Sequence, residues 1–249
     1  MENDSSALAV PAPAIGNHGG LLTTLLTLFW SPSTAFHTLR EKRWWFVPFL
    51  LCAATAVLFE FATSHYRMED LKQDIKSDPS YSSEEVGRRL ANIERQATGG
   101  VSLWQLGLAT TTLAAGHAAK MFGLALVVWL PLQLYATRIT YMTIVSVCSF
   151  IFLIKIPEAL LSGLLIRLKG TTRVFLGPAA LLPSDWFGSP LFSLLERLDI
   201  FSIWMAILLA MALPIVAELP RKKATMIVVY LWVVWLLEGA LLGNLFRIV

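Results

Sequence analysis

Five long apolar stretches alternate with shorter polar segments along this chain of 249 residues. They lie at about 45–63, within 108–135, within 139–166, at about 200–217 and at about 224–242. A helix needs about 20 apolar residues to cross the hydrocarbon core of a bilayer. The pattern therefore predicts an all-α membrane protein with five transmembrane helices, the third interrupted by the sequence KIPE at 155–158.

Two short amphipathic helices are predicted beside these spans, each opened by a Ser-Pro pair, at 31–32 and at 189–190. A hydroxyl before proline suits the cap and the first position of a helix. In the first of them, Phe36 and Leu39 mark an apolar face. After that face come residues suited to the lipid headgroup layer, which we predict to be interfacial anchors: Arg40, Lys42, Arg43, Trp44 and Trp45. Both helices are therefore expected to be interfacial, lying along the membrane surface.

The polar segment 64–103 separates the first two spans. Apolar residues recur at helical spacing on both sides of Asp78-Pro79, and Ser82 with Glu85 has the spacing of a capping box. These features predict a small extramembrane helical hairpin, the part of the chain best placed to meet a partner.

Composition and charge narrow the class of protein. Hydrophobic residues make up 56% of the chain and charged residues 15%, against roughly a quarter charged in soluble domains. The net charge of +3 includes no basic patch of the kind that binds nucleic acid, so no nucleic-acid partner is expected. Cys52 and Cys148 both fall in predicted spans, which argues against a disulfide. Residues 1–20, rich in Pro, Gly, Ser and Ala, are predicted to be a flexible tail before a membrane domain at 21–249.

The basic residues favour a cytoplasmic N-terminus, because Lys and Arg concentrate on the cytoplasmic side of membrane proteins. That orientation places inside the residues Arg40, Lys42, Arg43, Arg138, Arg221, Lys222 and Lys223. It leaves outside Arg167, Lys169, Arg173 and Arg197, which run against the rule. The two tightest basic clusters, at 40–43 and at 221–223, favour a cytoplasmic N-terminus.

Two pairs of ionisable residues lie within the predicted spans, where charge is costly and indicates a functional site by default. Lys155 and Glu158 have opposite charges three residues apart, and His117 and Lys120 have the same spacing in the second span. One interpretation is a polar pathway for an ion or substrate. The other is structural: an ion pair in a helix kinked by Pro157, and a closely packed face from which Lys120 extends outward.

Three carboxylates lie near span ends. Glu60 and Glu238 are expected to pair with Lys120 or to reach headgroups, and Asp199 is expected to cap the fourth span at the positive end of the helix dipole.

Catalytic signatures are missing from the sequence: it has no G-x-S-x-G elbow, no H-E-x-x-H motif, no P-loop and no Cys/His cluster with zinc spacing. We therefore expect neither an enzyme nor a cofactor or metal site.

Three segments resemble bacterial proteins of the Yip1 domain family. They are FWSPSTAFHTLREKRWWFVPFLL before the first span, KIPEALLSGLL in the third, and LLERLDIFSIWMAILLAMALPIVAELPRKKATMIVVYLWVVWLL at the end. The last carries Asp199, Phe201, Trp204, the Lys-Lys-Ala at 222–224, Trp232 and Trp235. The resemblance implies a five-helix, multi-pass bundle of the bacterial inner membrane with a cytoplasmic N-terminus. Eukaryotic Yip1 proteins associate with Rab GTPases, but their Asp-Leu-Tyr-Gly-Pro segment is absent here, so Rab binding is not carried over.

Together these features favour a scaffold, adaptor or membrane-organising protein that contacts lipids and other membrane proteins or a second copy of itself. One alternative is a small transporter or channel that uses His117, Lys120, Lys155 and Glu158. Another is a subunit of a larger complex whose spans serve as packing surface.

Overall fold

The computed structural model describes residues 20–98, 103–135, 138–183, 186–187 and 189–245, so the predicted tail lies outside the described residues except for Gly20. Within these residues the regular structure is helical, without strands, which confirms the all-α class. The α-helices are α1 (Leu21–Trp30), α2 (Pro32–Glu41), α3 (Phe46–Ser77), α4 (Ser83–Thr98), α5 (Leu103–Gln133), α6 (Tyr141–Ile151), α7 (Lys155–Lys169), α8 (Pro190–Arg197), α9 (Ile200–Val216) and α10 (Arg221–Leu245). Two short 3₁₀ helices are η1 (Phe152–Ile154) and η2 (Pro178–Leu181).

Three segments of the described chain are long and apolar enough to cross a membrane, namely α3, α5 and the run from α6 through α7. A fourth crossing is reached if α8 and α9, which meet at an angle of 57°, count as one span. The predicted fifth span falls within α10, which is a helix as expected, but its crossing of the membrane stays a prediction.

The core of the protein is built around α6. Every residue from 143 to 151 is buried, by contacts with α2, α3, α5 and α9. Two of these residues are serines, and each satisfies its hydroxyl within the helix: Ser146 donates to the carbonyl of Met142 at 3.0 Å, and Ser149 to that of Ser146 at 2.8 Å. A helix buried on all sides needs this internal pairing because no water reaches its hydroxyls.

The two amphipathic helices turn their apolar faces to protein. Phe36 and Leu39 of α2 are fully buried, in a helix that packs on α1, α6 and α9. Phe192 of α8 packs against Phe175 and Phe187, with ring centroids 4.9 Å apart in both cases. The helices occur where the sequence predicts them, yet these faces are not free to enter lipid. An amphipathic pattern records that one face is apolar, and says nothing of whether lipid or protein covers it.

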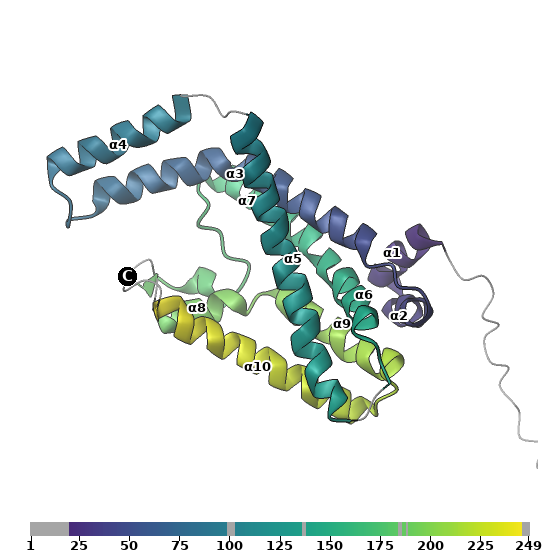
Figure 1. The fold of residues 1–249 in the computed structure, drawn as a ribbon. Coiled ribbons are helices and arrows are strands. Elements are labelled where there is room, and N and C mark those ends of the chain that lie inside the picture. The colour runs from purple at the N-terminus through teal and green to yellow at the C-terminus, as the bar shows by residue number, and fades with distance from the viewer. Residues whose placement is uncertain (1–19, 99–102, 136–137, 184–185, 188, 246–249) are drawn as a thin grey trace, which may run out of the picture.

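The first span continues without a break into the polar segment. α3 has 32 residues, so it is about 48 Å long and extends roughly 18 Å beyond a 30 Å hydrocarbon core. The expected boundary at residue 64 is thus a change of polarity inside one helix, and the hairpin consists of the end of α3 and α4. Figure 1 shows this hairpin reaching away from the bundle, on the side opposite to α1 and α2.

The hairpin turn follows the predicted chemistry. Ser80 donates its hydroxyl at 2.6 Å and its N–H at 2.9 Å to Asp78 Oδ1, and these bonds hold the pKa of that carboxyl below its usual range. Ser82 caps α4 by accepting the N–H of Glu85 at 3.3 Å. Ser31, expected to cap α2, instead bonds the hydroxyl of Thr34 at 2.8 Å and forms no cap with the helix backbone.

The loop after α7 is anchored at two places. Asp70 of α3 accepts the N–H of Thr172 at 2.6 Å and also its hydroxyl, while Arg173 forms an ion pair with Asp74 of α3. Farther along, Gly177 lies directly against the backbone at the α8–α9 junction, in contact with Leu198 and Asp199. The loop therefore ties the extended end of α3 to the start of α9.

Candidate functional site

The predicted pair of Lys155 and Glu158 lies at the middle of the span formed by α6, η1 and α7. Lys155 Nζ donates a hydrogen bond to Glu158 Oε1 at 2.9 Å. The same nitrogen lies 2.6 Å from Oε2, but off the direction of a hydrogen bond, so this buried oxygen accepts none from the described residues. The two charges compensate each other, as the i,i+3 spacing predicts, but only one of the two carboxylate oxygens accepts a hydrogen bond from the described residues.

The break in this span precedes the pair. Pro157, the third residue of α7, has no N–H for the carbonyl of Leu153 and would clash with it in a continuous helix. The chain adopts the 3₁₀ helix η1 at this point, over 152–154. The interruption expected at 155–158 is therefore one turn earlier, at the carbonyls that the proline leaves free.

Helix α5 brings the second predicted pair to the same place. The ring of His117 packs edge-to-face on Phe152 of η1 at 5.5 Å and lies 6.1 Å from the ring of Phe49 of α3. Lys120 and Lys155 are both close enough to act electrostatically on this imidazole. His117 Nε2 is buried, with no hydrogen-bond partner among the described residues. The two pairs, predicted separately, form one cluster.

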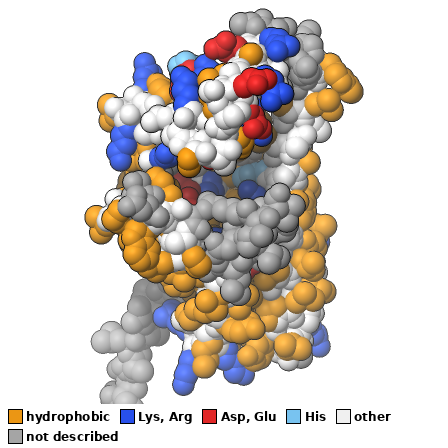
Figure 2. Space-filling model, turned by 90° about the vertical axis from the view of Figure 1, so that its left-hand side faces the viewer, with side chains coloured by type: hydrophobic (Ala, Val, Ile, Leu, Met, Phe, Trp, Pro, Cys, Tyr) orange, Lys and Arg blue, Asp and Glu red, His pale blue; other side chains and the backbone are white. Residues whose placement is uncertain are grey.

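Asp199 is a further member of the cluster. It caps α9 by accepting the N–H of Ser202 at 2.7 Å, which confirms its predicted role. It also lies close enough to Glu158 to act on it electrostatically. We call His117, Lys120, Lys155, Glu158 and Asp199 the central polar cluster. Figure 2 shows side chains of both charges, and a histidine, within a hollow between the polar and apolar parts of one face.

The central polar cluster draws its residues from α5, α7 and the start of α9. Its opposite charges offset part of the cost of placing ionised groups at membrane depth. Its unsatisfied imidazole nitrogen and carboxylate oxygen are groups that exchange protons or bind ions readily. In the described part of the chain, no three His, Cys, Asp or Glu side chains are grouped so that they could hold a metal ion.

Comparison with known proteins decides the family. The model of the Yip1 domain matches residues 26–242, from within α1 to within α10. The chain belongs to the Yip1 domain family. Neither the curated proteins nor the solved structures that were searched give a match.

Membership of the Yip1 family confirms the resemblance seen in the three sequence segments, all of which lie within the matched residues. Together with the apolar helices it makes the chain an integral membrane protein. The Yip1 match includes the hairpin, the central polar cluster and both Ser-Pro helices.

The predicted interfacial anchors of this Yip1 protein separate into different environments. Arg40 forms an ion pair with Glu218, in the link between α9 and α10. Lys42 Nζ lies 4.8 Å from the ring centroid of Trp44, whereas Trp45 packs against Phe122 of α5 at 5.7 Å. Arg43 is exposed. Contact of these side chains with lipid stays a prediction.

The two carboxylates expected near Lys120 have other partners. Glu60 accepts a hydrogen bond from Arg67 Nη2 at 2.8 Å, along the same face of α3. Glu238 accepts one from Arg197 Nη1 at 2.9 Å, which links α8 to α10. The spacing of seven residues could have indicated the first pair, since it returns to the same helix face. No local signal indicates the second, because 41 residues separate its partners.

Proposed function

We propose that this Yip1 protein is a non-enzymatic scaffold or adaptor with five spans in the bacterial inner membrane and a cytoplasmic N-terminus. The observation that carries the proposal is the unbroken continuation of α3 from the membrane into the polar hairpin. A partner bound to the hairpin is thereby held at a fixed height and direction relative to the spans.

The contacts of the hairpin support this role. Two carboxylates of the α3 extension, on Asp70 and Asp74, hold the loop after α7 through Thr172 and Arg173. α4 packs on α3, and its outer face carries exposed charged residues that include Glu84 and Arg88. These charges lie on the polar hairpin, which we place outside the lipid. A rigid, charged and projecting hairpin has the form of a docking element.

The arrangement of the links supports five crossings. Residues from the α2–α3, α5–α6 and α9–α10 links line one cavity, so these links lie at one end of the bundle. Lys223, at the start of α10, lies over the ring of Tyr135 after α5, at 5.2 Å. In a five-span chain these links are all on the side of the N-terminus, and they carry its two tightest basic clusters, which favours that side as cytoplasmic.

The adaptor function is tested by exchanging charges on α4 in place. The double variant Glu84→Lys, Arg88→Glu keeps net charge, helix length and the α3–α4 contact, but inverts the charge pattern that a partner meets. The full-length tagged protein is isolated from native membranes in a lipid-retaining nanodisc, and copurifying proteins are quantified. We expect a stoichiometric partner whose yield falls at least about tenfold in the double variant, because like charges then face each other.

The control is Arg221→Glu, a single charge change at the opposite end of the bundle, which should retain the partner. Equal recovery of the partner with both variants would contradict docking on the hairpin. Isolation of the chain alone, with lipid, would contradict the adaptor function. The remaining candidates would be a packing subunit and a transporter.

The central polar cluster favours the transporter as the second candidate. Its support is the pair of buried groups without hydrogen-bond partners in the described chain, His117 Nε2 and Glu158 Oε2, beside the helix break η1. Broken helices and ionisable groups at mid-membrane are features of ion and proton pathways.

A further inference from the structure

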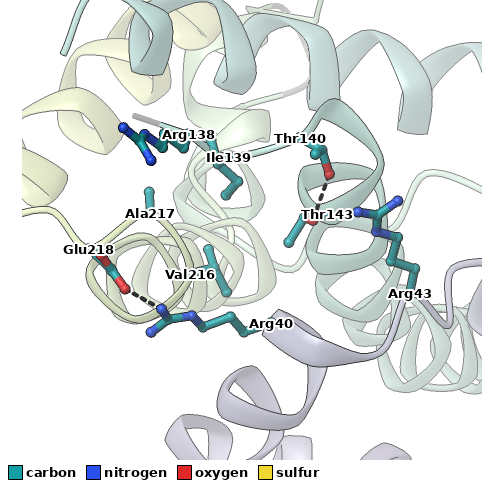
Figure 3. Close-up of a pocket in the computed structure, with 9 residues that line it drawn as sticks. All are labelled: Arg40, Arg43, Arg138, Ile139, Thr140, Thr143, Val216, Ala217 and Glu218. Atoms are coloured by element: carbon teal, nitrogen blue, oxygen red, sulfur yellow. Dashed lines mark hydrogen bonds and ion pairs between the residues drawn. The ribbon is translucent and has the colours of Figure 1, made fainter. Parts of the chain in front are cut away.

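An open cavity lies where three links between helices meet. Its volume is about 290 Å³. α2 and its link to α3 contribute Arg40 and Arg43, the α5–α6 link contributes Arg138, and the α9–α10 link contributes Glu218. Figure 3 shows these side chains arranged around the space from different elements. The other lining residues are Ile139, Thr140, Thr143, Val216 and Ala217. We call this space the arginine pocket.

The arginine pocket has an excess of positive charge. Three guanidinium groups line it against one carboxylate. That carboxylate, on Glu218, pairs with Arg40. Arg43 and Arg138 form no ion pair with the described residues, although each brings a planar set of N–H donors. The pocket can therefore accept an anion, and guanidinium groups match the geometry of phosphate oxygens especially well.

Uncharged donors lie on the wall formed by the start of α6. The hydroxyls of Thr140 and Thr143 bond each other at 2.9 Å, and the N-cap Thr140 makes no side-chain hydrogen bond to the helix backbone. The positive end of the α6 dipole is therefore open on the side of the pocket, where it adds to the attraction of the arginines for an anion.

Glu218 occupies an unusual backbone conformation. Its φ is 53°, the one non-glycine residue with positive φ in the described chain. This conformation is strained for a residue with a Cβ atom. Strain of this kind persists where the surroundings compensate it, often at binding sites. Here it accompanies the ion pair with Arg40, so Glu218 acts as an internal counter-ion that an incoming anion would displace.

The position of the pocket indicates the source of the anion. Its walls include the first residues of the α6–α7 span and the last residue of α9, so it lies where spans end. Trp44 and Lys42 stack nearby on the same α2–α3 link. These are residues of the headgroup layer. A volume at the lower limit of ligand pockets suits a headgroup rather than a whole lipid.

We infer that the arginine pocket binds the phosphate group of an anionic phospholipid, attracted by Arg43 and Arg138 from opposite sides of the space, with Glu218 as the competing internal anion. The assignment does not depend on the scaffold function, since a transporter would hold such a lipid equally.

The test measures lipid binding to the purified full chain in detergent by native mass spectrometry, with phosphatidylglycerol or phosphatidylcholine of the same acyl chains added stepwise. We expect preference for phosphatidylglycerol, and a loss of at least roughly thirtyfold in its affinity for Arg43→Gln, Arg138→Gln, because each substitution removes charge-assisted hydrogen bonds to the phosphate. The matched control Arg221→Gln, Lys222→Gln removes two cations at the same end but outside the pocket, and should change affinity less than about threefold, since charges without direct contact are screened.

A second variant keeps the inference testable if the arginine variant does not fold. Glu218→Gln removes the competing anion and should raise phosphatidylglycerol affinity several-fold. An unchanged or lower affinity would overturn the role of Glu218. Equal losses for the pocket and control variants would show bulk charge attraction and overturn the site. Binding of inorganic phosphate alone, with the same dependence on the variants and with displacement of the lipid at millimolar concentration, would overturn the lipid as its source.

Discussion

Lys155→Met alone should lower the free energy of unfolding by about 2–3 kcal/mol, the typical cost of an unpaired charge at mid-membrane. It leaves the Glu158 carboxylate without its cation and under the electrostatic influence of Asp199. Glu158→Gln should cost less, because the long Lys155 side chain can extend toward a more polar layer. The double variant should recover most of the loss, because no unpaired charge of the pair remains. Thermal unfolding of the parent, the two single variants and the double variant, all in one detergent, gives the coupling free energy of the pair.

The control is the pair of Glu69 and Lys72, which has the same spacing of three residues and a distance of 2.9 Å but lies on the polar end of α3, beyond the apolar part of the helix. Its three variants should each stay within about 0.5 kcal/mol of the parent. Additive losses at Lys155 and Glu158, with no recovery in the double variant, would contradict a structural ion pair.

The same variants separate the two proposed functions. If the single variants keep their stability but proton or ion flux into proteoliposomes disappears, the central polar cluster is a pathway. If stability follows the cycle above and the parent protein shows no flux, the Lys155–Glu158 pair is structural.

Gly177→Ala is expected to have the second large effect, a loss of about 2–3 kcal/mol. A Cβ at this position would lie 2.6 Å from the carbonyl oxygen of Leu198 and 3.2 Å from the Cα of Asp199. All the nearest atoms are backbone, so no flexible side chain can move aside. The loop must shift away from the α8–α9 junction, and the Asp199 cap of α9 is weakened with it. Thermal unfolding in detergent, followed by circular dichroism, measures the change.

Gly163→Ala provides the comparison. Its Cβ would meet only the ring of Phe59 at 3.7 Å, an ordinary van der Waals contact in the middle of α7. That variant should be neutral or slightly stabilising, since alanine favours the helix. Two variants of equal stability would show that the loop yields without cost and that the close approach does not constrain the junction.

The sequence predicts local features of this fold well, because those features depend on neighbouring residues. The Lys155–Glu158 pair follows from a spacing of three, and the caps at Ser82 and Asp199 follow from side chains that bond their own backbone. The break in the α6–α7 span follows from Pro157. It lies one turn before the proline, because that is the turn whose carbonyl groups lose a hydrogen-bond donor.

One boundary and one interpretation need a physical explanation. The change of polarity near residue 64 predicts where the chain leaves the lipid and not where the helix ends, because helix hydrogen bonds are indifferent to polarity, and α3 continues to Ser77, before Pro79. The apolar face of α2 was assigned to the membrane surface, yet its pattern is equally that of a face covered by α9.

The spacing of residues along the sequence does not predict which distant residues come together in the fold. His117 meets Phe152 only because α5 packs against α3 and α6, and Arg138 lines the same cavity as Arg40 only because two links end at the same level. Glu218 has no sequence signal at all for its left-handed backbone, because glycine or asparagine is the usual choice there.

The pairing of α2 with α9 has a consequence for how the protein is made. Arg40 and Glu218, at the two sides of this contact, are 178 residues apart. At roughly 5–20 residues per second, the ribosome adds that length in about 10–35 s. During this interval α1 and α6 can already pack on α2, but the part of its apolar face that α9 covers is still open. The burial of α2 is therefore completed only late in synthesis, when α9 has been made.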